Sequence, residues 1–190
     1  MDIEETPELR EFLSSLKLGE RLSGSVASIE SFGVFVALDD GPAHPLYPGV
    51  GFISYAELAW QRFDTPTEIV QVGQRVLCEF LQFDIWNGEA RLSLRATQPD
   101  PFQMFADATE AGQRLLGTVT KLVPFGAFVE VAPGIEGLVH VSEIARTPVE
   151  DPAEIVQLGD EITVVVTEVD RGRRRLALSR RQALCAPSAS

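Results

Sequence analysis

Short apolar segments separated by turn residues run through the second half of the chain. Turn-forming pairs, Pro-Gly after residue 132 and Arg-Gly after residue 170, stand between them. Five short strands with tight turns are typical of a small closed barrel. The segment 148–159 predicts a short helical turn before the fourth strand. The predicted strands are residues 114–123, 125–132, 135–141, 161–169 and 173–179.

Alternation within the second predicted strand separates an inward face from an outward face. Val129 lies in one phase, and Phe128 lies in the other phase beside a glutamate. Because Val fits a buried strand face, we expect Val129 to face inward and Phe128 to face outward. The first half of the chain repeats the pattern, with Val36 inward and Phe35 outward. An outward Phe either stacks on unpaired nucleobases or is covered by a loop or helix.

The chain also repeats itself at a larger scale. The run GERLSGSV at residues 19–26 is answered by GQRLLGTV at residues 112–119, an offset of 93. Further along, PTEIVQVG at residues 66–73 is answered by PAEIVQLG at residues 152–159, where the offset is 86. The first copy therefore contains seven extra residues, which fit the Pro-rich stretch 41–49 as an enlarged surface loop. Two copies predict two domains.

A helix-start signal precedes each copy. Thr6-Pro7 and Asp100-Pro101 both place a capping residue before a Pro at the first helical position. The residues after Pro101 are too apolar for a free linker, so we expect this connector to pack on a barrel. The predicted division is an N-terminal helical extension (1–17), a first domain (18–97), a helical connector (98–111), a second domain (112–181) and a disordered tail (182–190).

Composition and charge restrict the partners. The chain is 45% hydrophobic and 23% charged, as in an ordinary globular protein, but its net charge of −12 is unusual for a protein that binds phosphate. Residues 1–99 carry a net charge of −8 and residues 100–190 one of −4, and six of the nine bases in the second half lie between Arg171 and Arg181. Any electrostatic contact with a polyanion is therefore expected near the last predicted strand. Arg175 faces outward there, and the first copy is predicted to place Arg91 equivalently.

Other chemistries find little support in the sequence. Cys78 and Cys185 lie far apart, and His44 stands in the Pro-rich loop, so neither a disulfide framework nor a zinc site is indicated. There is no phosphate-binding Gly-rich loop and no metal-ligand constellation. We therefore expect no enzyme, no cofactor and no metal. No signal sequence and no apolar run of about 18–20 residues is present, so a cytoplasmic location is expected.

Several motifs of the second copy, taken in order, resemble the S1 RNA-binding domain. They are FGAFV at residues 125–129, GLVHVSEI at 137–144, the pair Val169-Asp170 and RLALS at 175–179. The resemblance implies an OB-fold barrel, and the expected fold class is all-β. We expect two five-stranded OB-fold barrels in tandem, with short helices at the N-terminus and in the connector. The chain resembles a shortened ribosomal protein S1.

The resemblance also implies an RNA-binding face. In the second copy it comprises Phe125, Phe128, His140, Asp170, Arg174 and Arg175, and the run of arginines leaves open which one takes the role. The first copy matches at Phe32, Phe35, Asp84 and Arg91 but has Ser54 where the family has His. Its loop is longer and its charge more negative, so the first domain is expected to bind RNA weakly or to contact protein.

Two functions follow from these expectations. The first is a non-enzymatic protein that holds single-stranded RNA, such as mRNA in translation, by stacking and arginine contacts of the second domain. The alternative is an adaptor that docks on the ribosome, a nuclease or RNA polymerase and has little RNA affinity. No membrane or small-molecule partner is expected.

Overall fold

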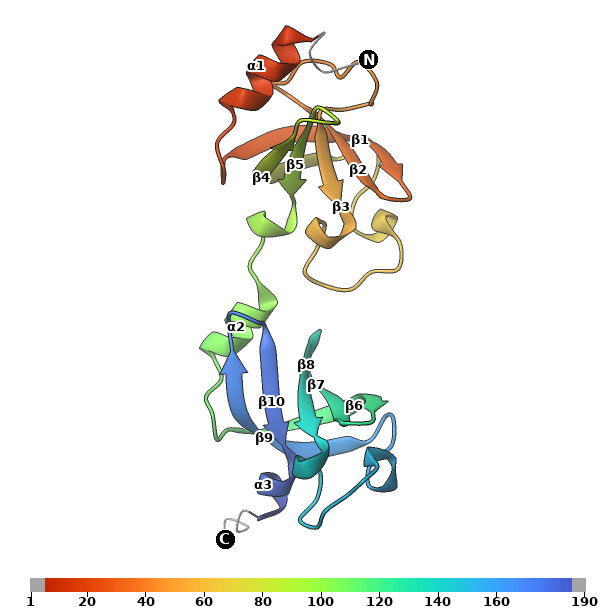
Figure 1. Cartoon of the computed structure of the whole chain (residues 1–190), viewed down its shortest axis with the longest axis vertical. Helices are drawn as coiled ribbons and strands as arrows, with labels where there is room; N and C mark the ends of the chain where they lie inside the picture. Colours follow the sequence, from red (N-terminus) through yellow and green to blue (C-terminus); the bar gives the residue numbers. More distant parts are fainter. Residues whose placement is uncertain (1–5, 186–190) are drawn as a thin grey trace. The chain divides into compact units, whose positions relative to one another are not determined.

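The chain forms two separate compact units, which divide between Asp100 and Pro101 (Figure 1). The computed structural model describes residues 6–185. Each unit contains five strands closed into a barrel, so we call them the first and the second barrel. The predicted all-β class with two five-stranded OB-type barrels is confirmed.

The first barrel has the strand order β1-β2-β3-β5-β4. All neighbouring strands are antiparallel except β3 and β5, which are parallel. Its elements are α1 (Pro7–Ser15), β1 (Arg21–Glu30), β2 (Gly33–Leu38), β3 (Gly51–Ser54), β4 (Arg75–Asp84) and β5 (Glu89–Ser93), with 3-10 turns η2 (Tyr55–Glu57), η3 (Pro66–Glu68) and η4 (Arg95–Thr97).

The second barrel repeats this topology in the order β10-β8-β7-β6-β9, with β8 and β10 parallel. Its strands lie within two residues of the five predicted segments, and η6 is the helical turn predicted before the fourth strand. Its elements are α2 (Pro101–Asp107), β6 (Arg114–Val123), β7 (Gly126–Ala132), β8 (Ile135–His140), η5 (Val141–Glu143), η6 (Pro152–Glu154), β9 (Glu161–Asp170), β10 (Arg175–Ser179) and α3 (Arg180–Cys185).

A short helix closes part of each barrel core. Leu9 and Leu13 of α1 are buried in the core of the first barrel, at the end where Figure 1 shows the helix. Phe102 and Ala106 of α2 are buried in the core of the second barrel. Both helices begin at the Pro that the sequence marks, and the connector packs on a barrel as expected.

The predicted disordered tail is wrong for residues 182–185, which belong to α3. Ala183 is buried, the backbone N–H of Gln182 donates to Ser179 Oγ at 3.0 Å, and Arg114 donates to the Ala183 carbonyl. Gln182, Ala183 and Leu184 are good helix formers, and these contacts anchor the segment on the barrel. The rest of the tail, 186–190, and the start of the N-terminal extension, 1–5, lie outside the described residues. Within residues 6–185, no helix is long and apolar enough to cross a bilayer.

Candidate nucleic-acid interface

A row of three outward side chains crosses the wall of the second barrel. The strand registers place Phe128 of β7 opposite Leu138 of β8, and Leu138 beside Ala177 of β10. None of the three belongs to the buried core cluster, whereas Val129 does. Phe128 therefore faces outward, as the alternation predicts, and it is half-buried.

Phe125 and His140 lie at one end of this row. Phe125 directly precedes β7 and is 51% exposed. His140 ends β8, is exposed and is paired with Gly126, while the Val141 N–H donates to the Phe125 carbonyl at 2.8 Å. The fold thus brings Phe125 and His140 to adjacent strand ends, and His140 shares the strand phase of Leu138, which lies opposite Phe128.

The His140 ring has a defined orientation. Its Nδ1 accepts the backbone N–H of Ser142 at 3.2 Å and lies 2.9 Å from Ser142 Oγ. A neutral imidazole that accepts at Nδ1 carries its proton on Nε2. The exposed ring therefore presents an N–H donor at Nε2, which suits a phosphate or carbonyl oxygen.

The arginines of the β9–β10 turn point to different partners. Arg174 has a left-handed backbone (φ 54°), and its guanidinium lies 5.3 Å from the centroid of the Phe102 ring in α2. Arg175 begins β10, is exposed and faces Asp170 in the strand register. Asp170 Oδ1 accepts the backbone N–H of Arg173 at 2.9 Å, which fixes the turn. Within residues 6–185 no hydrogen bond or ion pair involves the Arg175 side chain, so Arg175 is the more available cation.

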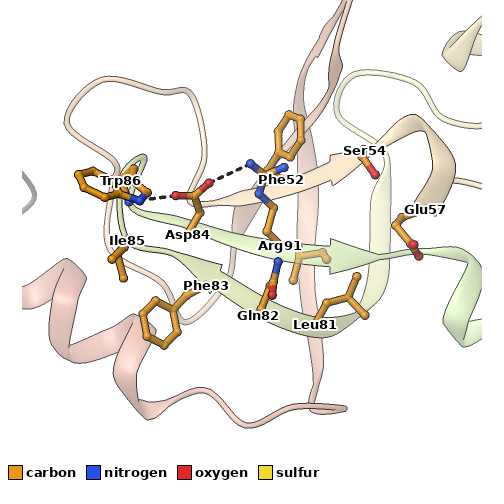
Figure 2. Close-up of a pocket in the computed structure, with 11 residues that line it drawn as sticks. Phe52, Ser54, Glu57, Leu81, Gln82, Phe83, Asp84, Ile85, Trp86 and Arg91 are labelled. Carbon is orange, nitrogen blue, oxygen red and sulfur yellow. Dashed lines mark hydrogen bonds and ion pairs between the residues drawn. The ribbon is translucent and has the colours of Figure 1, made fainter.

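The corresponding row in the first barrel is Phe35, Phe52 and Arg91 (Figure 2 shows the last two). The Arg91 guanidinium lies over the Phe52 ring, 4.8 Å from its centroid, and pairs with Asp84 at 3.0 Å. The phenyl ring of Phe32 is exposed and stacks on Phe52 at a centroid distance of 6.0 Å. Four of the five residues predicted for this copy therefore gather around Phe52. The fifth, Ser54, ends β3 at the position of His140 and is partly buried.

This first row is covered, unlike the second. Phe35 is only 3% exposed because Tyr47, from the loop between β2 and β3, stacks on it. The ring centroids are 5.1 Å apart and the planes differ by 18°. In the second barrel the same connection is the tight turn Pro133-Gly134, which leaves Phe128 partly open. The enlarged Pro-rich loop thus places Tyr47 across this face of the first barrel.

The strand registers correct one predicted equivalence. Asp84 faces Glu89 across the β4–β5 hairpin, whereas Asp170 faces Arg175 across the β9–β10 hairpin. The counterpart of Arg175 is therefore Glu89 and not Arg91, which stands two residues further along β5. Both copies contain the sequence Arg-Leu-x-Leu, but in the first copy it begins two residues further along the last strand of the barrel. The first barrel thus has a carboxylate where the second has its available arginine.

Two carboxylates beside Arg91 have pKa values shifted in opposite directions. Burial raises the pKa of Glu89, which is 4% exposed, although Arg91 lies 3.6 Å away. Burial also acts to raise the pKa of Asp84, but hydrogen bonds from Arg91 and from the backbone N–H groups of Asn87 and Trp86 outweigh it, so the pKa of Asp84 is lowered. Arg91 is shared between these two carboxylates and is less available to a phosphate.

A shallow hollow of about 420 Å³ lies beside this row in the first barrel (Figure 2). Phe52, Arg91, Asp84, Gln82 and Trp86 are among the residues that line it, and the backbone N–H of Trp86 donates to Asp84 Oδ1 at 2.9 Å. Trp86 stands at the β4–β5 turn and is 87% exposed. Such an exposed indole offers a flat apolar surface to a ligand or partner.

Neither a cluster of metal ligands nor a reactive Cys78 thiolate is found in the described part of the barrels. Among residues 6–185, no group of three or more His, Cys, Asp or Glu side chains is placed to hold a metal ion. Cys78 is buried in β4, and burial raises the pKa of its thiol to about 12, so the reactive thiolate is disfavoured.

The sequence profile of the S1 RNA binding domain matches residues 15–95 and 109–181, which coincide with the two barrels. The chain belongs to the S1 RNA binding domain family.

Relatives of this S1 protein are named as ribosomal proteins. Small ribosomal subunit protein bS1 of Mycolicibacterium smegmatis is 47% identical over 91% of this chain and 34% of its own length. The bS1 homolog of Bacillus cereus is 36% identical over 96% of this chain and 46% of its own. The chain thus spans between a third and a half of the length of these relatives. The solution structure of GSP13 from Bacillus subtilis matches 43% of this chain and 63% of its own, at 38% identity and a TM-score of 0.40.

Several residues of the two S1 faces were not predicted from the sequence. Leu138 and Phe52 occupy the centre of each row, and strand phase alone could have found them, since they stand in β8 and β3 opposite the outward Phe residues. Tyr47 and His44 carry no such signal, because their place on the first face depends on how a long loop folds back. Trp86 is visible in the sequence only as an aromatic residue within a turn.

Proposed function

We propose that the second S1 barrel holds single-stranded RNA, without catalysis, by stacking unpaired bases on Phe125 and Phe128. Arg175 and the Nε2–H of His140 contact phosphate or base oxygens beside the rings, and Asp170 positions the turn that precedes Arg175. Arg174 is a second candidate cation, but its position over Phe102 favours Arg175. The first barrel, with Phe32, Phe35, Ser54, Asp84 and Arg91, makes a smaller contribution.

The observation that carries this proposal is the open row Phe128, Leu138 and Ala177 of the second barrel, with Phe125 and His140 near one end of it. Phe128 of β7 is half-buried, Phe125 directly before β7 is 51% exposed, and an exposed histidine ends the neighbouring strand β8. An exposed aromatic ring is costly in water unless a partner covers it, and every nucleobase offers a flat surface that can do so. Stacking of this kind selects single strands and little sequence.

The family and the names of the relatives support the biological setting. The chain belongs to an RNA binding domain family, and relatives that match most of it are small ribosomal subunit proteins. We propose that the RNA is mRNA and that the protein acts in translation in the cytoplasm. Because the chain spans only part of these relatives, contact with the ribosome belongs to the same proposal.

Fluorescence anisotropy of a labelled single-stranded RNA tests the proposal. We expect wild type to bind and Phe128→Ala to lose about 1–3 kcal/mol of binding free energy, the contribution of one stacked base. Leu158→Ala is the matched control, because Leu158 is an exposed apolar residue of the same barrel away from the row. Equal affinity of wild type and Phe128→Ala, with both well folded, would show that RNA does not use this face.

Docking to a protein is a second candidate, and the exposed hairpin of the first barrel favours it. Phe83, Ile85 and Trp86 form an exposed apolar cluster at the β4–β5 end. Contacts of such a cluster with a protein should be nearly independent of salt, whereas phosphate contacts weaken steeply as salt is added. A wild-type protein that binds no RNA even at low salt would leave docking as the leading function.

A further inference from the structure

The covered face of the first barrel is built around one stacked pair. Phe35 corresponds to Phe128 of the second barrel, since each is the outward aromatic residue of its second strand. Tyr47 lies on Phe35 in an offset stack, at 5.1 Å and 18°. A phenol ring of the protein therefore lies against Phe35, whereas the corresponding ring of the second barrel remains partly exposed.

His44 holds Tyr47 in this place. Its ring packs on the Tyr47 ring at a centroid distance of 4.6 Å, and its Nδ1 accepts the backbone N–H groups of Leu46 and Tyr47, each at 3.0 Å. An imidazole that accepts twice at Nδ1 has its proton on Nε2, which lies 2.8 Å from the Asn87 carbonyl and donates to it. The loop is thereby tied to the β4–β5 turn.

The surface under Tyr47 retains the components of a base-binding face. Phe35 rests on Phe52 at 5.3 Å, and Phe32, the counterpart of Phe125, stands exposed beside both. Two carboxylates of this barrel are already paired: Asp84 with Arg91 at 3.0 Å and Asp39 with Arg75 at 2.6 Å. Ion pairing lowers the repulsion that these acids would exert on a phosphate.

We infer that the first barrel contains a latent nucleobase site on Phe35, which Tyr47 fills in place of an unpaired RNA base. This inference rests on the proposed function, because it assigns to Phe35 the stacking role proposed for Phe128. A ring tethered by a short loop competes at a high effective concentration, so an RNA base from solution is at a disadvantage while the loop is in place. Displacement of Tyr47 opens the site, and Phe32 borders the position that the base enters.

The test compares variants in a background that lacks the second stacking ring, Phe128→Ala. Adding Tyr47→Ala is expected to raise affinity for a labelled single-stranded RNA at least about five-fold, the lower end of what one stacked base contributes. Leu46→Ala is the matched control, because Leu46 stands in the same loop but is exposed. Adding Phe35→Ala to the Tyr47→Ala variant is expected to remove the gain.

Two further measurements keep the result interpretable. Both tryptophans, Trp60 and Trp86, lie in the first barrel. Trp86 stands in the hairpin to which His44 is hydrogen-bonded. RNA that enters this site is therefore expected to change the tryptophan fluorescence. A variant without residues 41–47 removes as many residues as the first copy has in excess of the second, and it tests the same point without a truncated side chain. Thermal melts confirm that each variant folds.

The outcomes separate this inference from the proposed function. Unchanged or weaker RNA binding in both the Tyr47→Ala and the loop-shortened proteins overturns the latent site, whatever wild type does. If wild type binds no RNA but these variants do and change tryptophan fluorescence, the role of the second barrel falls while the latent site stands. If none of the proteins binds RNA, both fall.

Discussion

Equivalent residues of the two barrels stand in different surroundings, and the difference decides what each can bind. Phe35 and Phe128 both face outward, but Tyr47 covers the first while the second stays partly open. At the turn of the last hairpin, Arg175 is exposed and its counterpart Glu89 is buried. A stacking ring next to an available cation suits RNA, whereas a covered ring next to a buried carboxylate does not.

Glu89 should make the stability of the first barrel depend on pH. A carboxyl with a raised pKa in the folded protein stabilises the fold in its protonated form; this contribution is complete below the unfolded value of 4.5 and is lost as the pH rises through the folded pKa. We therefore expect Glu89→Gln to gain stability relative to wild type as the pH rises above the unfolded value of 4.5. The measurement is urea unfolding followed by tryptophan fluorescence, since both tryptophans lie in this barrel.

The opposite pH dependence of stability is expected for Asp84→Asn. The pKa of Asp84 is lowered, so the contribution of its carboxylate is present above the unfolded pKa and is lost as the pH falls through the folded one. Relative to wild type, this variant should lose stability toward neutral pH. A common direction of change in both variants would contradict these assignments.

At the scale of elements, the sequence predicts strands well and registers poorly. Alternation is a local property, so every strand of the second barrel lies within two residues of its predicted segment. A register depends on turns and bulges: β4 and β5 shift register between Phe80 and Gln82, and this geometry pairs Glu89 with Asp84. The stack of Tyr47 on Phe35 depends on how a long loop folds back over the barrel, which no local pattern encodes.

Helix α1 contributes to the first barrel by filling its core. Leu9 is almost completely buried there. We expect Leu9→Ala to lower the unfolding free energy of this barrel by about 2–5 kcal/mol, because it leaves a cavity as well as removing buried apolar surface. Leu18→Ala is the control, since Leu18 lies just beyond the helix and is exposed. Urea unfolding read by tryptophan fluorescence checks the difference; equal losses would mean that α1 does not complete this core.

At the scale of the whole molecule, a net charge of −12 limits how strongly the protein can hold RNA. The arginines between 171 and 181 are also less available than their number suggests. Arg171 pairs with Asp107 at 2.6 Å, Arg181 pairs with Glu143 at 2.8 Å, and Arg180 donates to the Ile144 carbonyl at 3.0 Å. Under the proposed function, stacking therefore supplies most of the affinity for RNA, and phosphate neutralisation the smaller part.

The salt dependence of RNA binding measures this balance. Each phosphate neutralised on a single strand contributes about −0.7 to the slope of log K against log salt, so a face with one or two available cations should give a slope of about −1. Arg175→Gln is expected to make the slope less negative by about 0.7, whereas Arg181→Gln should leave it unchanged because Glu143 already holds that side chain. Anisotropy titrations at several KCl concentrations give the slopes. If Arg181→Gln changed the slope and Arg175→Gln did not, RNA would lie against α3 and η5 instead of the row that contains Phe128.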